Sequence, residues 1–122
     1  MKESDLSLYK TVEALQLASA RRHIVLCVGG GKCATDESSG DAWTFLKRRL
    51  KELGVVDTVG GVLRTRAACL RVCKAGPVAV VYPEGVWYRD CTVENLEKII
   101  HEHLLNGRIV QELVVVENRL AH

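Results

Sequence analysis

Five cysteines carry most of the chemistry open to this sequence, and four of them fall into two close pairs, Cys27 with Cys33 and Cys69 with Cys73. Two thiols a few residues apart can turn to the same side of a short loop, so each pair could hold one iron of a [2Fe-2S] cluster. The spacings, C-x5-C and C-x3-C, differ from the C-x2-C pairs of zinc ribbons and thioredoxin-type oxidoreductases. Spacing alone therefore predicts one metal centre, with zinc binding and purely structural thiols as alternatives.

The second pair opens the most distinctive stretch of the chain, CLRVCKAGPVAVVYPEGVWY, which runs from Cys69 to Tyr88. Together with the earlier HIVLC, this stretch resembles the thioredoxin-like [2Fe-2S] ferredoxins, which are related to the small peripheral iron–sulfur subunit of respiratory complex I. The resemblance covers residues 22–106. It implies that Gly76 and Pro77 support the exit from a ligand loop, and that a [2Fe-2S] cluster is bound by Cys27, Cys33, Cys69 and Cys73.

Local patterns predict the elements that position these cysteines. A β-branched run at His23–Val28 predicts a buried strand that places Cys27 at its end. Further along, the patterns predict a helix capped within Ser38–Asp41 and closed by Gly54, a strand over 60–66, a hairpin of 78–82 and 85–88, and a helix from Thr92 to Asn106-Gly107. This order fits an α/β protein with a thioredoxin-like fold, a mixed β-sheet flanked by helices, and the resemblance implies the same.

The chain of 122 residues divides into an N-terminal helical extension (1–21), a thioredoxin-like [2Fe-2S] ferredoxin domain (22–106) and a C-terminal tail (107–122). A helical stripe of apolar residues in 4–19 predicts a helix that packs on the domain's flank or docks a partner. The apolar run Leu113–Val116 predicts an added strand, or a segment that pairs with another chain.

Composition narrows the class of protein. Hydrophobic residues make up 48% and charged residues 26%, which is ordinary for a soluble globular domain. We expect no membrane span and no secretory signal, and five cysteines without export indicate a reducing, cytoplasmic compartment. Sparse aromatics exclude a typical nucleic-acid surface. Basic residues near the cysteines predict either a solvated loop or a positive collar that steers acidic partners: Lys32, Arg64, Arg66, Arg71 and Lys74.

The fifth cysteine, Cys91, precedes the helix cap Thr92 and is predicted to be structural. It could replace Cys33 as a ligand, because C-x5-C is shorter than the spacer usual in the family, and its place near a helix N-terminus could make it reactive. The run Gly29–Gly31 could let backbone N–H groups approach cluster sulfurs. The histidines show no ligand spacing with the cysteines, and no hydrolytic constellation stands out.

The sequence thus predicts an electron-transfer protein and not an enzyme: a [2Fe-2S] ferredoxin that carries one electron at a time between redox partner proteins. We expect transient docking with acidic surfaces, and the resemblance implies a homodimer. Two other classes stay open. One is a zinc-stabilised binding module on the same four cysteines; the other is a thioredoxin-like thiol redox protein or sensor that uses Cys69 and Cys73, or Cys91.

Overall fold

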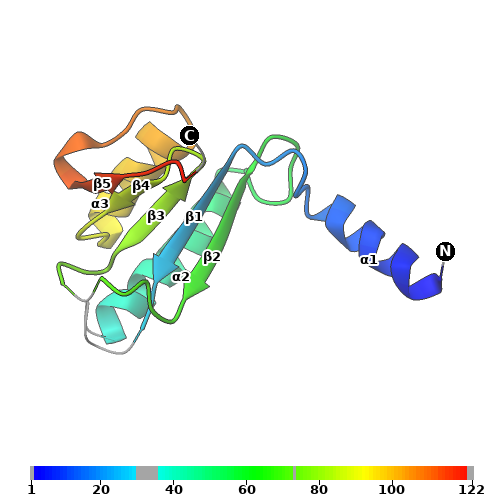
Figure 1. The fold of residues 1–122 in the computed structure, drawn as a ribbon, viewed down its shortest axis with the longest axis horizontal. Helices are drawn as coiled ribbons and strands as arrows, with labels where there is room; N and C mark the ends of the chain where they lie inside the picture. Colours follow the sequence, from blue (N-terminus) through cyan, green and yellow to red (C-terminus); the bar gives the residue numbers. More distant parts are fainter. Residues whose placement is uncertain (1, 30–35, 73, 121–122) are drawn as a thin grey trace.

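The computed structural model describes residues 2–29, 36–72 and 74–120, which form one mixed β-sheet with helices packed against it (Figure 1). In chain order the elements are α1 (Glu3–Ala14), β1 (Arg22–Cys27), α2 (Asp36–Glu52), β2 (Val62–Ala67), β3 (Ala79–Tyr82), β4 (Val86–Tyr88), α3 (Val93–Ile99), a π-helical turn η1 (Ile100–Leu104), a 3-10 turn η2 (Gln111–Leu113) and β5 (Val114–Glu117). The predicted α/β class and the predicted order of strands and helices are confirmed.

The five strands lie in the order β2-β1-β3-β4-β5. The β1 and β2 strands run parallel, whereas β1–β3, β3–β4 and β4–β5 are antiparallel pairs. The β3–β4 hairpin forms as predicted, and the apolar run in the tail supplies β5, an added strand at the sheet edge of the same chain. Because β1 and β2 are parallel, Cys27 and the segment that leads to Cys69 leave the sheet at the same end.

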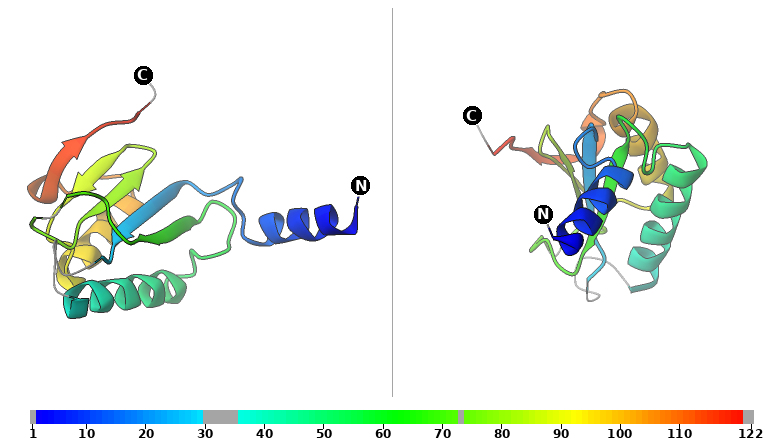
Figure 2. Two further views of the ribbon diagram at one scale, coloured as in Figure 1. Left: turned by 60° about the horizontal axis from the view of Figure 1, so that its bottom comes forward. Right: turned by 90° about the vertical axis from the view of Figure 1, so that its right-hand side faces the viewer.

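One face of the sheet is covered and forms the core. Ile24 and Leu26 of β1 are fully buried in a core that also contains Leu46 of α2 and Leu96 of α3. Figure 2 shows α2 and α3 together on this side of the sheet. We refer to it as the helix face. The opposite face, which carries the alternate residues of each strand, is covered by no helix among the described residues, and we refer to it as the open face.

Helix boundaries follow local capping only in part. The side chain of Thr92 accepts a hydrogen bond from the Asn95 N–H at 3.3 Å, which confirms the predicted cap of α3. The α2 helix begins at Asp36, before the predicted caps at Ser38–Asp41, so that boundary was wrong.

The N-terminal helix α1 does not pack on the domain's flank as one of the two expectations had it. It projects from the body (Figure 1) and buries none of its residues. None of the described helices is long and apolar enough to cross a membrane.

A buried network of polar side chains connects the start of β1 to the β3–β4 hairpin and to η1. The Val110 N–H donates to the Tyr88 hydroxyl at 3.1 Å, which lies 2.7 Å from His103 Nδ1. His103 Nε2 lies 2.8 Å from Glu84, which also receives two hydrogen bonds from Arg22. Burial lowers the pKa of His103. A neutral His103 that accepts a hydrogen bond from Tyr88 and donates one to Glu84 gives every side chain of this network a hydrogen-bond partner.

Replacement of Glu84 by alanine should lower the free energy of unfolding by about 2–3 kcal/mol, because it leaves the Arg22 guanidinium and the His103 N–H without their partner. Burial alone would raise the pKa of Glu84, yet hydrogen bonds from Arg22 and His103 hold it below its usual value. Urea unfolding followed by circular dichroism measures the loss. Glu102→Ala removes an exposed ion pair with Arg108 and is the control. Equal urea midpoints for Glu84→Ala and Glu102→Ala would contradict a structural role for this hydrogen-bond network.

Candidate metal centre

Cys27 lies at the last position of β1, and strand alternation places its side chain on the open face, opposite its neighbour Leu26. Its side chain is 1% exposed. The Cys27 N–H donates to the Val78 carbonyl at 2.9 Å, and the Cα partner of Cys27 across the sheet is Ala67. Cys27 therefore lies between two neighbouring strands, at the point where one ends and the other begins.

Those two neighbours are the ends of the loop that bears the second cysteine pair. The loop, residues 68–77, leaves β2 after Ala67 and returns to the sheet at Val78. The Val28 N–H donates to the Ala67 carbonyl at 2.9 Å and so extends the contact beyond Cys27. The returning half is held by a hydrogen bond from the Cys91 N–H to the Pro77 carbonyl at 2.8 Å. Both ends of the cysteine loop are thereby fixed next to Cys27.

Gly29 brings the first cysteine segment against this same loop. A Cβ atom at residue 29 would overlap the backbone carbonyl of Ala68, so only glycine fits there. We had expected the glycines to approach cluster sulfurs. For Gly29 the close neighbour is instead the Ala68 backbone, and Gly30 and Gly31 lie outside the described residues. The chain that continues toward Cys33 thus starts in contact with the residue before Cys69.

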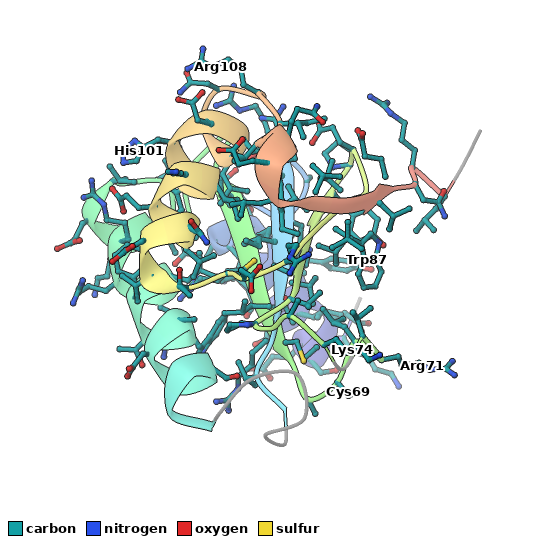
Figure 3. The ribbon with its side chains drawn as sticks, turned by 90° about the vertical axis from the view of Figure 1, so that its left-hand side faces the viewer. Cys69, Arg71, Lys74, Trp87, His101 and Arg108 are labelled. Carbon is teal, nitrogen blue, oxygen red and sulfur yellow. The ribbon has the colours of Figure 1, made fainter. Side chains whose placement is uncertain are left out.

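Cys69 is exposed on this loop, and its sulfur accepts a hydrogen bond from the Arg71 N–H at 3.2 Å. An N–H donor of this kind stabilises negative charge on a thiolate. Figure 3 shows Cys69, Arg71 and Lys74 together at this end of the molecule. The predicted ligands Cys33 and Cys73 lie outside the described residues. Among the described residues, no three potential metal ligands converge.

The predicted positive collar is only partly supported by the structure. Arg71 and Lys74 are exposed on the cysteine loop itself. Arg64 and Arg66 pair with Ile24 and Leu26 across β1–β2, which places their side chains on the helix face. Lys32 lies outside the described residues.

Comparison of the sequence with known proteins identifies the family of this chain. No family model matches the chain. A curated relative from Clostridium pasteurianum, "Ferredoxin, 2Fe-2S", is 31% identical over 106 residues, which span 81% of this chain and 100% of the relative. The relative of that name from Aquifex aeolicus is 30% identical over 105 residues, or 80% of this chain and 92% of the relative. The chain belongs to the [2Fe-2S] ferredoxins.

Solved structures identify the branch of the family. A thioredoxin-like [2Fe-2S] ferredoxin from Aquifex aeolicus is similar to this chain with a TM-score of 0.69 and 25% identity, and the match covers 81% of this chain and 94% of that one. The thioredoxin-like fold inferred from the order of elements is thus confirmed. The comparisons also support the function of an electron carrier for this ferredoxin.

Cys91 of this ferredoxin is part of the core and not of the cysteine loop. It is fully buried among the residues that pack on the helix face, and its thiol lies 3.7 Å from the Tyr88 carbonyl. Burial raises the pKa of Cys91 to about 12. Burial therefore disfavours the thiolate form of Cys91, contrary to the suggestion that the helix N-terminus makes this thiol reactive. Its burial in the core favours the structural role that was predicted for Cys91.

The described residues fit a [2Fe-2S] cluster. Cysteine thiolates are the soft donors that iron–sulfur clusters require, and two of the four predicted ligands come from segments that the sheet brings together. One is buried and the other lies on an exposed loop with an N–H donor to its sulfur. Sequence reasoning found these cysteines but missed Ala67, Ala68 and Val78, the backbone positions that hold the two segments in contact. The only sequence signal for them was the glycine at position 29.

Proposed function

We propose that this ferredoxin is a one-electron carrier whose [2Fe-2S] cluster is bound by Cys27, Cys33, Cys69 and Cys73. The observation that carries the proposal is the position of Cys27, which lies between Ala67 and Val78, the two ends of the loop that bears Cys69 and Cys73. A loop held at both ends keeps its thiolates in place, so little rearrangement needs to accompany a change of charge.

The bound cluster supplies a site that accepts and releases one electron. The cluster would be bound by cysteine thiolates, and groups of the chain would offset the added negative charge. The Arg71 N–H donates to the Cys69 sulfur, and the side chains of Arg71 and Lys74 add positive charge on the same loop. Hydrogen bonds to sulfur and nearby cations both favour the reduced form and so raise the reduction potential.

We further propose that the protein acts as a carrier without enzyme activity of its own, passing electrons between redox partner proteins. Arg71 and Lys74 support transient docking of partners with acidic surfaces. A homodimer is proposed from the family resemblance. A cytoplasmic location is proposed because five cysteines of this kind belong in a reducing compartment.

The test is the visible spectrum of anaerobically purified protein before and after dithionite, with iron, sulfide and zinc measured on the same sample. We expect a red-brown protein with about two irons and two sulfides per chain that bleaches on reduction. A colourless protein with one zinc would favour the zinc-stabilised module instead. A colourless, metal-free protein that recovers no cluster on reconstitution would leave only the thiol redox alternative.

A further inference from the structure

An apolar hollow lies on the open face beside the cysteine loop. Its volume is about 310 Å³, and it draws its lining from the cysteine loop, the β3–β4 hairpin and the C-terminal edge of the sheet. The lining residues are Val72, Val78, Trp87, Val115, Val116 and Asn118. Five of these six side chains are apolar, which is unusual for a surface that no other described element covers.

A β-bulge creates this hollow at the sheet edge. In a regular strand, Val115 and Val116 would point to opposite faces. The register between β4 and β5 shifts at Trp87/Tyr88, so that Trp87 pairs with Val116 and Tyr88 pairs with Val114, which leaves Val115 as the extra residue. Both valines line the hollow, and each is 50% exposed. The bulge therefore gives an edge strand two adjacent apolar side chains at solvent.

The hollow adjoins the candidate metal centre directly. Val78, in its lining, is the residue whose carbonyl accepts the hydrogen bond from Cys27. Val72, on its other side, belongs to the cysteine loop. Cys27 and Trp87 also share the open face, since Cys27 alternates with Leu26 and Trp87 with Tyr88. A side chain seated in the hollow would touch the loop that holds the predicted ligands.

The charged residues of the cysteine loop, which contributes Val72 to the hollow, are all basic. Arg71 precedes Val72 and Lys74 follows it by two residues, and Figure 3 shows Trp87, Lys74 and Arg71 on the same side of the molecule in that view. From Val62 to Gly76 the sequence contains no acidic residue. Glu117 follows Val116 in β5, but it pairs with Val86, which is buried on the helix face, so the Glu117 side chain lies on that face. The hollow thus combines an apolar lining with an adjoining loop whose charged residues are basic.

We propose that this hollow is the docking site for an acidic segment of a redox partner protein, with one apolar side chain of that segment seated against Trp87. The inference rests on the proposed function, which it deepens by naming the surface and the chemistry of the partner. An apolar anchor inside a charged rim is the usual anatomy of a specific contact, in which the anchor supplies affinity and the charges supply orientation.

The test uses the cluster-loaded protein and a fluorescein-labelled peptide that carries one leucine between runs of aspartate and glutamate, with binding followed by fluorescence anisotropy. Val116→Asp and Lys74→Glu should each weaken binding by about tenfold. The matched controls change the same residue types elsewhere: Val59→Asp in the exposed turn before β2, and Lys98→Glu on α3. We expect both controls to bind like the unmodified protein.

Two further peptides test the hollow without any change to the protein. One replaces the leucine by serine, and the other replaces the acids by asparagine and glutamine; both should bind about tenfold more weakly. The docking proposal is wrong if the serine peptide binds as well as the leucine peptide, or if Val116→Asp binds like Val59→Asp. It is also wrong if sedimentation shows that Val116→Asp, and not Val59→Asp, converts a dimer to a monomer, because a second copy then fills the hollow.

The visible spectrum of the same samples separates failure of the docking site from failure of the proposed function. If the protein holds a reducible cluster but does not bind the peptide, only the docking proposal is overturned. A protein that holds no cluster has no redox partner, and that result overturns both proposals.

Discussion

Cys27→Ala should yield a protein that folds but has lost its visible absorption and most of its iron. Removal of a group that merely orients a metal ligand typically costs about 10–100-fold in metal affinity, and loss of a direct ligand should cost at least as much. Alanine is preferred to serine, because a serine oxygen can still bind iron. Iron, sulfide and the visible spectrum of anaerobically purified protein measure the effect.

Cys91→Ala is the matched control, since the side chains of Cys27 and Cys91 are 1% and 0% exposed. Removal of the Cys91 sulfur opens a small cavity in the core and should cost about 1–2 kcal/mol of stability while the spectrum is kept. A colourless Cys91→Ala together with a coloured Cys27→Ala would reverse the assignment. Cys91 would then be a ligand despite its place on the helix face.

Much of the fold could be predicted because local patterns encode it. The β-branched run before Cys27, the turn at Pro83-Glu84-Gly85 and the Thr92 cap each depend on a few adjacent residues. The start of α2 was misplaced because Ser38, Ser39 and Asp41 are good caps that here lie inside the helix. Good local capping chemistry was outweighed by the wider context of the helix.

For the candidate site, the sequence predicted which residues take part but not how they are arranged in space. The paired spacing of cysteines indicates a metal centre without any knowledge of register. The contacts of Cys27 with Ala67 and Val78 join residues far apart in the chain, and they follow from strand pairing that no local pattern reveals. The hollow was missed for the same reason. It depends on one bulge opposite Trp87, and before folding the run LVVVE reads only as an apolar strand.

Local sequence patterns and long-range strand pairing together determine what lies on the open face of the sheet. Burial on the helix face fixes the alternation of β1, and that alternation sends Cys27 to the other side, where no described helix competes for the space. The cysteine loop can therefore close over Cys27 and still present Cys69 to solvent. A carrier needs both features: ligands held firmly, and a path by which a partner can approach them.

The close approach of Gly29 to the Ala68 carbonyl leaves no room for a side chain. Gly29→Ala should lower stability by about 1–3 kcal/mol and reduce cluster content, because the new methyl group overlaps the Ala68 carbonyl and must separate the first cysteine segment from the second. Urea titration of the loaded protein, followed by both circular dichroism and visible absorption, should show the cluster lost at a lower urea concentration than in the unmodified protein.

Gly40→Ala offers a control with the opposite sign. Gly40 lies within α2, and a Cβ atom there meets nothing within 4 Å. Alanine in a helix is favoured over glycine by about 0.5–1 kcal/mol, so this variant should be slightly more stable and keep its cluster. If Gly29→Ala instead matches Gly40→Ala in both readouts, the two cysteine segments do not depend on the Gly29–Ala68 contact. The cluster would then be held by the cysteine loop's own attachment to Cys27.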